Sequence, residues 1–240
     1  MCTVTYIPIN NKDAFVLTSN RDEKECRPTL PPQVYEHENI SIAYPKDQEA
    51  GGSWIAINNK GKMNCLLNGA FVAHKKKDYH TVSRGTILLE FTKSELSADD
   101  FFSGKDLNSV EPFTIVSIKQ FNGKVLELTE FIWDGSDKHL SRPEKDRPHM
   151  WSSAIYTKEQ KETREKWFAN FLDQNKENLS SNNILEFHSG NHTNDNSINI
   201  IMQRQGGFRT VSITQITAEG SHLQMSYLDL LKESKIDVIL

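Results

Sequence analysis

The chain has only three cysteines among its 240 residues, and no two of them form a CxxC pair. These cysteines are Cys2, Cys26 and Cys65. An odd number of widely spaced cysteines excludes a disulfide framework and gives no zinc-binding signature. The first residues also lack a charged segment followed by an apolar one, so we expect no signal peptide. Together these absences predict a cytoplasmic protein that needs no metal.

Long apolar runs and a surplus of positive charge are missing as well. No stretch approaches the roughly 20 apolar residues of a membrane span, so we expect no transmembrane helix. The net charge is -4 and the pI is about 6.1, which argues against nucleic acid as a partner. The run Lys75-Lys76-Lys77 is interpreted as a solvated loop tip.

What is present is the composition of an ordinary soluble protein, with 37% hydrophobic and 25% charged residues. A chain of this length can bury a sizeable core without disulfides or metals. The sequence shows no internal repeat, no low-complexity tract and no linker. We therefore expect a single domain over residues 1–240. Nothing in the sequence fixes the oligomeric state.

Stretches rich in β-branched and aromatic residues dominate both ends of the chain, and amphipathic stretches lie in its middle. Residues 27–50 are rich in proline and polar residues, so we expect mostly loop there. This distribution predicts an α+β fold in which helices cover sheets. The predicted strands are 2–8, 14–18, 39–44, a hairpin over 51–68, 113–118, 124–133, 198–203, 210–217 and 223–228. The predicted helices are 87–91, one starting at 98–102, 157–175 and 182–188.

The position of Cys2, next to the initiator methionine, is the strongest chemical signal. Cysteine is small enough for an aminopeptidase to remove Met1, which would give one residue both a thiol and a free α-amine. A thiolate is a strong nucleophile, and an α-amine titrates near ~8, close enough to neutrality to act as a base. A single residue could then supply nucleophile and base.

The first two predicted strands form a hairpin, which brings the end of the second strand back to the start of the first. We therefore expect Asn20, Arg21 and Asp22, just past the second strand, to lie near Cys2. The alternative is that Arg21 and Asp22 form an exposed ion pair at a hairpin end, which would contribute little.

Several short motifs occur in a fixed order along the chain. They are Met1-Cys2, Asn20-Arg21-Asp22-Glu23, Arg27-Pro28, Gly51-Gly52-Ser53-Trp54-Ile55-Ala56, Gly61-Lys62, Asn68 and Arg209-Thr210-Val211-Ser212-Ile213-Thr214-Gln215-Ile216. Together they resemble the NRDE family, the group that contains transport and Golgi organisation protein 2. That family in turn is similar to N-terminal nucleophile (Ntn) hydrolases, among them cysteine enzymes that cleave linear amides, such as bile-salt and penicillin acylases. The resemblance implies a four-layer αββα sandwich of two stacked antiparallel sheets.

The resemblance also implies roles for individual residues. Cys2 would attack an acyl carbonyl while its own α-amine accepts the thiol proton. Asp22 would hold that amine in place, and Arg21 would favour the thiolate. Asn68 would form part of the oxyanion hole.

Three further residues are candidates by the same resemblance. Asn20 belongs to the motif itself. Ser153 stands where the hydrolases carry a second asparagine, and a hydroxyl can donate one hydrogen bond there. Arg164, on the helix expected over 157–175, takes the place of a late arginine in those enzymes.

Two functional hypotheses follow. The first is an Ntn-type cysteine amidohydrolase-like protein that acts on an amide or thioester and requires no cofactor. The alternative is a non-catalytic intracellular protein that binds or transports a ligand, either haem or an acyl lipid. Asn68-Gly69 has the alternative interpretation of a simple turn, and Cys26, Cys65 and Trp54 that of core residues. His188 and His192 are interpreted as structural or solvent-facing.

Overall fold

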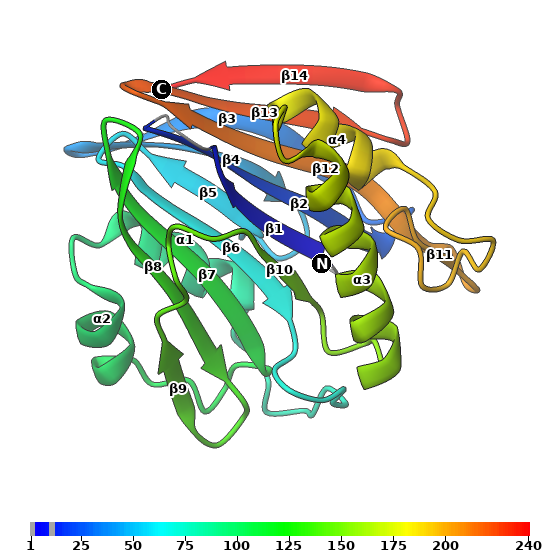
Figure 1. The fold of residues 1–240 in the computed structure, drawn as a ribbon. Coiled ribbons are helices and arrows are strands. Elements are labelled where there is room, and N and C mark those ends of the chain that lie inside the picture. Colours follow the sequence, from blue (N-terminus) through cyan, green and yellow to red (C-terminus); the bar gives the residue numbers. More distant parts are fainter. Residues whose placement is uncertain (1–2, 10–12) are drawn as a thin grey trace.

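The structure is a computed structural model that describes residues 3–9 and 13–240. In these residues two antiparallel sheets stack face to face, and two helices cover the outer face of each sheet (Figure 1). The layers run helix, sheet, sheet, helix, which confirms the predicted α+β class and the αββα sandwich. Met1, Cys2 and the predicted turn residues 10–12 lie outside the described residues.

The first sheet contains the N-terminal strand. Its described strands follow the order β10-β1-β2-β12-β13-β14, and β11 pairs with β12. The central position of β2 brings the first strand of the chain and its C-terminal part together, because β1 pairs with one edge of β2 and β12 with the other. The strands are β1 (Thr3–Pro8), β2 (Ala14–Lys24), β10 (His149–Ser152), β11 (Gln203–Arg204), β12 (Phe208–Glu219), β13 (His222–Asp229) and β14 (Ser234–Ile239).

The second sheet is a meander in which each described strand pairs with the next one along the chain. Such an arrangement needs only tight turns, and the turn between β5 and β6 contains Gly61 at a φ of 78°. The strands are β3 (Thr29–His37), β4 (Ile40–Asp47), β5 (Ile55–Asn58), β6 (Lys62–Asn68), β7 (Phe113–Phe121), β8 (Lys124–Trp133) and β9 (Lys138–Ser141).

Four helices of the described chain form the outer layers. α1 (Arg84–Lys93) and α2 (Ala98–Gly104) pack on the second sheet, and α3 (Lys158–Asn175) and α4 (Ser181–Ser189) pack on the first. α3 begins at a capping box, in which Thr157 accepts from the Gln160 amide and the Gln160 side chain accepts from the Thr157 amide. The helices predicted from the sequence are therefore all confirmed.

Alternation along β1 and β2 sorts side chains between the layers. Val4, Tyr6 and Leu17 face the second sheet and pack in the core between the sheets. Ile7 and Val16 face the opposite way and pack against α3 and α4. One face of the first sheet therefore contacts the second sheet, and the other contacts α3 and α4.

β2 is longer than the sequence predicts. The strand expected over 14–18 extends to Lys24, so Asn20, Arg21 and Asp22 lie inside it rather than just past its end. The extension pairs with β12, which comes from the C-terminal part of the chain. Local propensity carries no information about a partner so far along the sequence, which explains the error.

Two other predictions are wrong. The segment 27–50 contains the strand predicted over 39–44, observed as β4, but a second long strand, β3, takes the place of predicted loop. Pro31 and Pro32 fall where the pairing of β3 with β4 shifts, and β3 is an edge strand, where proline is tolerated. The strand predicted over 198–203 is reduced to the two residues of β11, and the segment before it is irregular.

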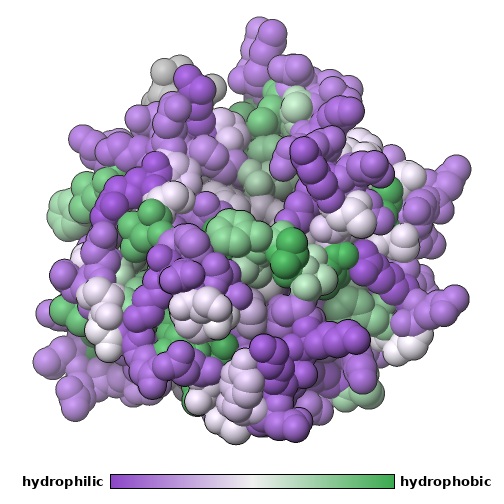
Figure 2. Space-filling view, turned by 90° about the horizontal axis from the view of Figure 1, so that it is seen from below, coloured by the Kyte–Doolittle hydropathy of each residue, from purple (hydrophilic) through white to green (hydrophobic). Residues whose placement is uncertain are grey.

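The face seen from below in Figure 2 is largely hydrophilic, with its hydrophobic side chains in separate patches. Figure 1 shows β9 and the connection between β6 and α1 at this end of the molecule. That connection exposes Phe71 and Val72 together with Lys75, Lys76 and Lys77, so the lysine run is solvated as predicted. No helix within residues 3–9 and 13–240 is long and apolar enough to cross a membrane.

Candidate active site

Thr3 is the first described residue, and it is held from three sides. It lies opposite Asn20 of β2 and opposite Ser152 of β10 in the first sheet. Its hydroxyl accepts a hydrogen bond from Arg164 Nη2 of α3. The predicted nucleophile, Cys2, lies outside the described residues, but its covalent neighbour is fixed in the centre of this group.

Arg164 is completely buried under the first sheet. Its Nη1 donates to the carbonyl oxygens of Ile198 and Asn199 at 2.6 and 2.7 Å, and its Nε donates to Ser152 Oγ at 3.2 Å. The guanidinium also stacks over the Tyr156 ring, 4.2 Å from its centroid. Arg164 therefore connects α3 with the start of β1 and with β10 on the helix side of the first sheet.

Asn20 lies on the same helix side and contacts His188 of α4. Its amide nitrogen donates to the carbonyls of His188 and Ile200 at 3.0 and 3.1 Å. The Asn20 side-chain oxygen must therefore accept from His188 Nδ1, which assigns the ring proton to Nδ1. His188 Nε2 then accepts from the Thr5 hydroxyl at 2.7 Å.

The pKa of His188 is lowered to about 3, mainly by burial and in smaller part by the neighbouring Arg164 and His192. The imidazole is thus neutral at physiological pH, in agreement with a single proton on Nδ1. The prediction that His188 is structural is confirmed, since it joins α4 to β1 and β2.

Asp22 is buried two residues after Asn20 on β2, and so it is on the same side of the strand. Its Oδ1 accepts a hydrogen bond from Thr210 Oγ1 at 2.5 Å. Thr210 Oγ1 in turn accepts from the Met202 amide at 2.8 Å. This contact lies beside a shift in register between β2 and β12, which falls between Thr210 and Ser212.

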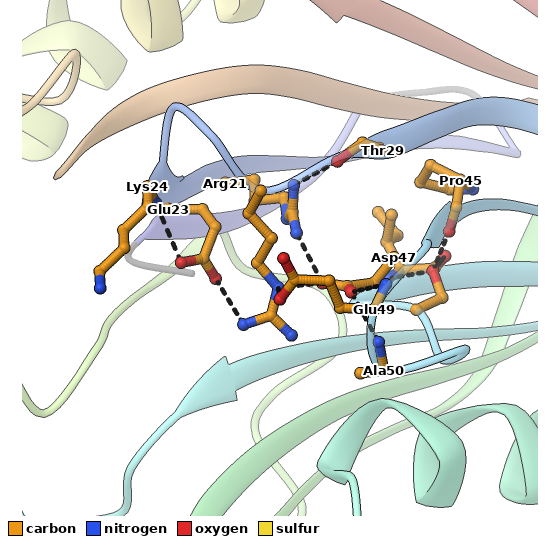
Figure 3. A network of polar contacts seen from close by, with 11 residues as sticks. Arg21, Glu23, Lys24, Thr29, Pro45, Asp47, Glu49 and Ala50 are labelled. Carbon is orange, nitrogen blue, oxygen red and sulfur yellow. Dashed lines mark hydrogen bonds and ion pairs between the residues drawn. The ribbon is translucent and has the colours of Figure 1, made fainter. Parts of the chain in front are cut away.

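Arg21 points the other way, between the sheets (Figure 3). Its Nη2 is 2.8 Å from Asp47 Oδ2, and its Nη1 donates to Thr29 Oγ1 at 2.5 Å. The guanidinium stacks on Trp54, with 4.2 Å to the ring centroid. Asp47 Oδ2 accepts a further bond from Arg27 Nε at 2.7 Å. One carboxylate therefore holds two guanidinium groups.

The charges in this network keep each other ionised. Burial raises the pKa of Asp47, but a hydrogen bond from the Ala50 amide and the charges of Arg27 and Arg21 lower it more, so the net direction is downward. Burial lowers the pKa of Arg21, and Asp47 opposes that shift. The interpretation of Arg21 as part of an exposed ion pair is wrong, because both partners are buried.

Asn68 ends β6 and meets the segment that follows β10. Its backbone oxygen accepts from Ser153 Oγ at 3.1 Å. Gly69 has a φ of 83°, and a Cβ there would lie 2.5 Å from the Ala154 Cβ. Only glycine allows this approach. Because the single proton of Ser153 is donated to Asn68 O, Ser153 connects the two sheets here.

A cavity of about 90 Å³ opens beside Arg21 and Asn68. Three arginines, Arg21, Arg27 and Arg84, line it together with Trp54 and Ser83. The N-terminus of α1 reaches this cavity because Gly52 and Gly85 pack backbone to backbone, and a Cβ on Gly52 would lie 2.5 Å from the Gly85 carbonyl carbon. Gly52 thus permits a close contact between the loop before β5 and α1.

The structure thus divides the predicted site residues between two sides of the first sheet. Arg21 and Asn68 line the cavity beside the N-terminus of α1, whereas Asn20, Asp22 and Arg164 lie on the α3 and α4 side of the first sheet. Sequence reasoning missed Asp47 and Arg84, and it did not connect His188 with Asn20. Ser83-Arg84-Gly85 precedes the helix predicted over 87–91, but nothing in the sequence indicated that these residues would line a cavity with Arg21.

Of the other cysteines, Cys65 is buried between the sheets, and burial raises the pKa of its thiol to about 12. The prediction that Cys26 is a buried residue is wrong, since it is exposed in the loop between β2 and β3. Trp54 is a core residue, as predicted. Within the described part of the chain, no group of three or more His, Cys, Asp or Glu residues is arranged to hold a metal ion.

The chain is similar to known proteins both in sequence and in fold. The family model described as Transport and Golgi organisation 2 matches residues 1–228 of this chain. A comparison with curated proteins finds no match. The family match covers both sheets up to β13 and every candidate residue.

Three solved structures with the Ntn-hydrolase fold are similar in shape over most of their length. The Caenorhabditis elegans ortholog of N-acylethanolamine-hydrolyzing acid amidase has a TM-score of 0.60 at 11% identity and covers 90% of this chain and 92% of its own. Penicillin V acylase from Agrobacterium tumefaciens has a TM-score of 0.57 at 11% identity, with 100% and 86% covered. A variant of conjugated bile acid hydrolase from Clostridium perfringens has 0.62 at 8%, with 99% and 92% covered. At these identities the likeness establishes the Ntn-hydrolase-like fold.

Proposed function

The chain belongs to the transport and Golgi organisation 2 family, and from that premise we propose that it is an Ntn-type cysteine amidohydrolase. The substrate is an amide or a thioester of an acyl group. Cys2 is the nucleophile once Met1 has been removed.

The observation that carries the proposal is the way Thr3 is held. Asn20, Ser152 and Arg164 fix it from three sides, although Thr3 itself has no chemistry to perform. The Cα of Cys2 lies within about 3.8 Å of the Thr3 Cα by covalent geometry. Side chains alternate between the two faces of a strand, so positions 2, 4 and 6 belong to one set. The side chains of Val4 and Tyr6 face the space between the sheets.

The reaction begins when the α-amine of Cys2 takes the thiol proton and Sγ attacks the acyl carbonyl carbon. The tetrahedral intermediate collapses, the bond to the amine or thiol leaving group breaks, and that group takes the proton. Water then attacks the acyl-thioester, again with the α-amine as base. A carboxylic acid is released and the thiol is restored.

Residues around Thr3 supply the remaining functions. Asp22, fixed by Thr210, orients the protonated α-amine. Arg21 stays charged between the sheets and favours the thiolate. The Asn68 side chain donates to the oxyanion, and removing one such donor costs about 10²–10³ in rate in well-studied cases. Ser153 and Arg164 act by positioning Asn68 and Thr3.

The test is thiophenol release from S-phenyl thiobutyrate, followed by absorbance with purified full-length protein. The wild type should turn over, and Cys2→Ala should not. Cys26→Ser is the matched control, because Cys26 is the exposed cysteine of the described chain, and it should retain the wild-type rate.

Equal release by the wild type and Cys2→Ala would refute the enzymatic assignment. In that case the alternative prediction, a non-catalytic protein that binds haem or an acyl lipid, would take its place. A shift of the haem Soret band that depends on Cys2 would support that alternative.

A further inference from the structure

The cavity beside Arg21 and Asn68 has an excess of positive charge. Three guanidinium groups line it, against the two carboxylates of Glu23 and Asp47. The chain as a whole has a net charge of -4, so this excess is local. We call this space the anion cavity.

Of the three arginines that line the anion cavity, Arg84 has the longest hydrogen bond to the described residues. Its Nη1 donates to the Pro112 carbonyl at 3.3 Å, and its Nη2 lies 3.7 Å from Glu111 Oε1. A guanidinium has five N–H donors in a fixed fork that matches the oxygens of a carboxylate or phosphate. Its side chain is only 19% exposed, so most of this donor capacity lies inside the protein.

The N-terminus of α1 adds backbone donors at the same place. Ser83 is the N-cap residue, and its side chain makes no capping hydrogen bond. The first amides of a helix have no partner within the helix, and the helix dipole favours negative charge there. Ser83, Arg84 and Gly85 all line the anion cavity.

Trp54 supplies an independent observation. It lines the anion cavity and is only 4% exposed. Its Nε1 has no acceptor among the residues that the structure describes. An indole N–H can only donate, and a buried donor of this kind normally has a partner. A residue that lines the cavity thus carries a buried donor with no acceptor in the described part of the chain.

We propose that the anion cavity binds an oxyanion group, a carboxylate or a phosphate, carried by the substrate. The inference rests on the proposed function, since Arg21 and Asn68 belong to both sites. The substrate class is then an anionic acyl compound rather than a neutral one. The space of about 90 Å³ is enough for roughly three water molecules, which suits one such group and not a whole substrate.

Binding is tested without catalysis by NMR of ¹⁵N-labelled full-length Cys2→Ala protein. Inorganic phosphate, acetate and chloride are titrated separately at constant ionic strength while the four indole N–H signals are followed. The signal of Trp54, assigned with Trp54→Phe, should move in a saturable way with phosphate or acetate but not with chloride. The anion that binds more tightly, phosphate or acetate, shows whether the cavity binds a phosphate or a carboxylate group.

Arg84→Gln should weaken this binding by about tenfold or more, as expected for the loss of a charge-assisted contact. Arg147→Gln is the matched control, because Arg147 is exposed and pairs only with Glu144 among the residues described. It should leave the binding unchanged. A Trp54 signal that stays fixed in both anions would overturn the proposal whatever the variants do.

The link to the substrate is tested with two thioesters, neutral S-phenyl thiobutyrate and anionic mono-S-phenyl thiosuccinate. The ratio of their rates should favour the anionic thioester and fall by about tenfold in Arg84→Gln. Anion binding without turnover of either thioester would refute the proposed function and leave the anion cavity intact. Turnover with an unchanged ratio would refute the cavity as a substrate site and leave the nucleophile intact.

Discussion

Arg164 of α3 donates a hydrogen bond to the hydroxyl of Thr3, 161 residues earlier in the chain. The same guanidinium also binds two backbone carbonyls and Ser152. A buried arginine therefore connects the residue after Cys2 with β10 and with the irregular segment before β11. The geometry at the N-terminus depends on α3 being in place.

Arg164→Lys should lower the free energy of unfolding by about 2–4 kcal/mol, since an ammonium cannot reach all four acceptors and leaves buried carbonyls without a donor. Urea denaturation at neutral pH measures the change. Arg147→Lys, at an exposed arginine, should change stability by less than about 0.5 kcal/mol. Equal midpoints for the two variants would contradict the role assigned to Arg164.

His188 should make the protein sensitive to mild acid. Its pKa is about 3 in the folded state against 6.5 in the unfolded chain, so the unfolded state binds more protons between these values. Stability is therefore complete above pH 6.5 and falls as the pH drops, by roughly 2 kcal/mol between pH 6.5 and about 5.

His188→Gln tests this assignment, because glutamine keeps a donor and an acceptor but does not titrate. The variant should be less stable than the wild type at neutral pH and should lose less stability on acidification. Urea midpoints measured at several pH values give both slopes. Parallel curves for the two proteins would show that His188 does not cause the acid sensitivity.

Gly52→Ala should disrupt the contact between the loop before β5 and α1. Its Cβ would lie 2.5 Å from the backbone of Gly85, which cannot move without displacing the helix. We expect a loss of about 1–3 kcal/mol, typical of overpacking. Gly104→Ala is the control, since Gly104 ends α2 and a Cβ there has no neighbour within 4 Å. The midpoint of thermal unfolding should be lower for Gly52→Ala than for the wild type, and it should not be lowered for Gly104→Ala.

Local pattern was enough to predict most elements of the fold. The apolar spacing of Trp167, Phe168 and Phe171 predicts α3, and the turn at Gly61 predicts the β5–β6 hairpin. The errors have a common cause. The end of β2 needs β12, and the proline-containing β3 needs β4, so each depends on a tertiary partner.

The candidate site was predictable only as a set of residue types. The motif Asn20-Arg21-Asp22 places polar groups on β2, but alternation along the strand sends Arg21 to one side and its two neighbours to the other. Asp47 and Arg84 reach Arg21 and its cavity through the packing of the second sheet and α1. No spacing in the sequence encodes those contacts.

The central claim is that Cys2 is an N-terminal nucleophile, and intact mass spectrometry of the native protein tests it most directly. The mass is measured before and after a brief exposure to S-phenyl thiobutyrate, and fragmentation locates any adduct. The account predicts a chain lacking one methionine that gains one butyryl group on residue 2. A chain that retains Met1, or an adduct found only on Cys26, would contradict it.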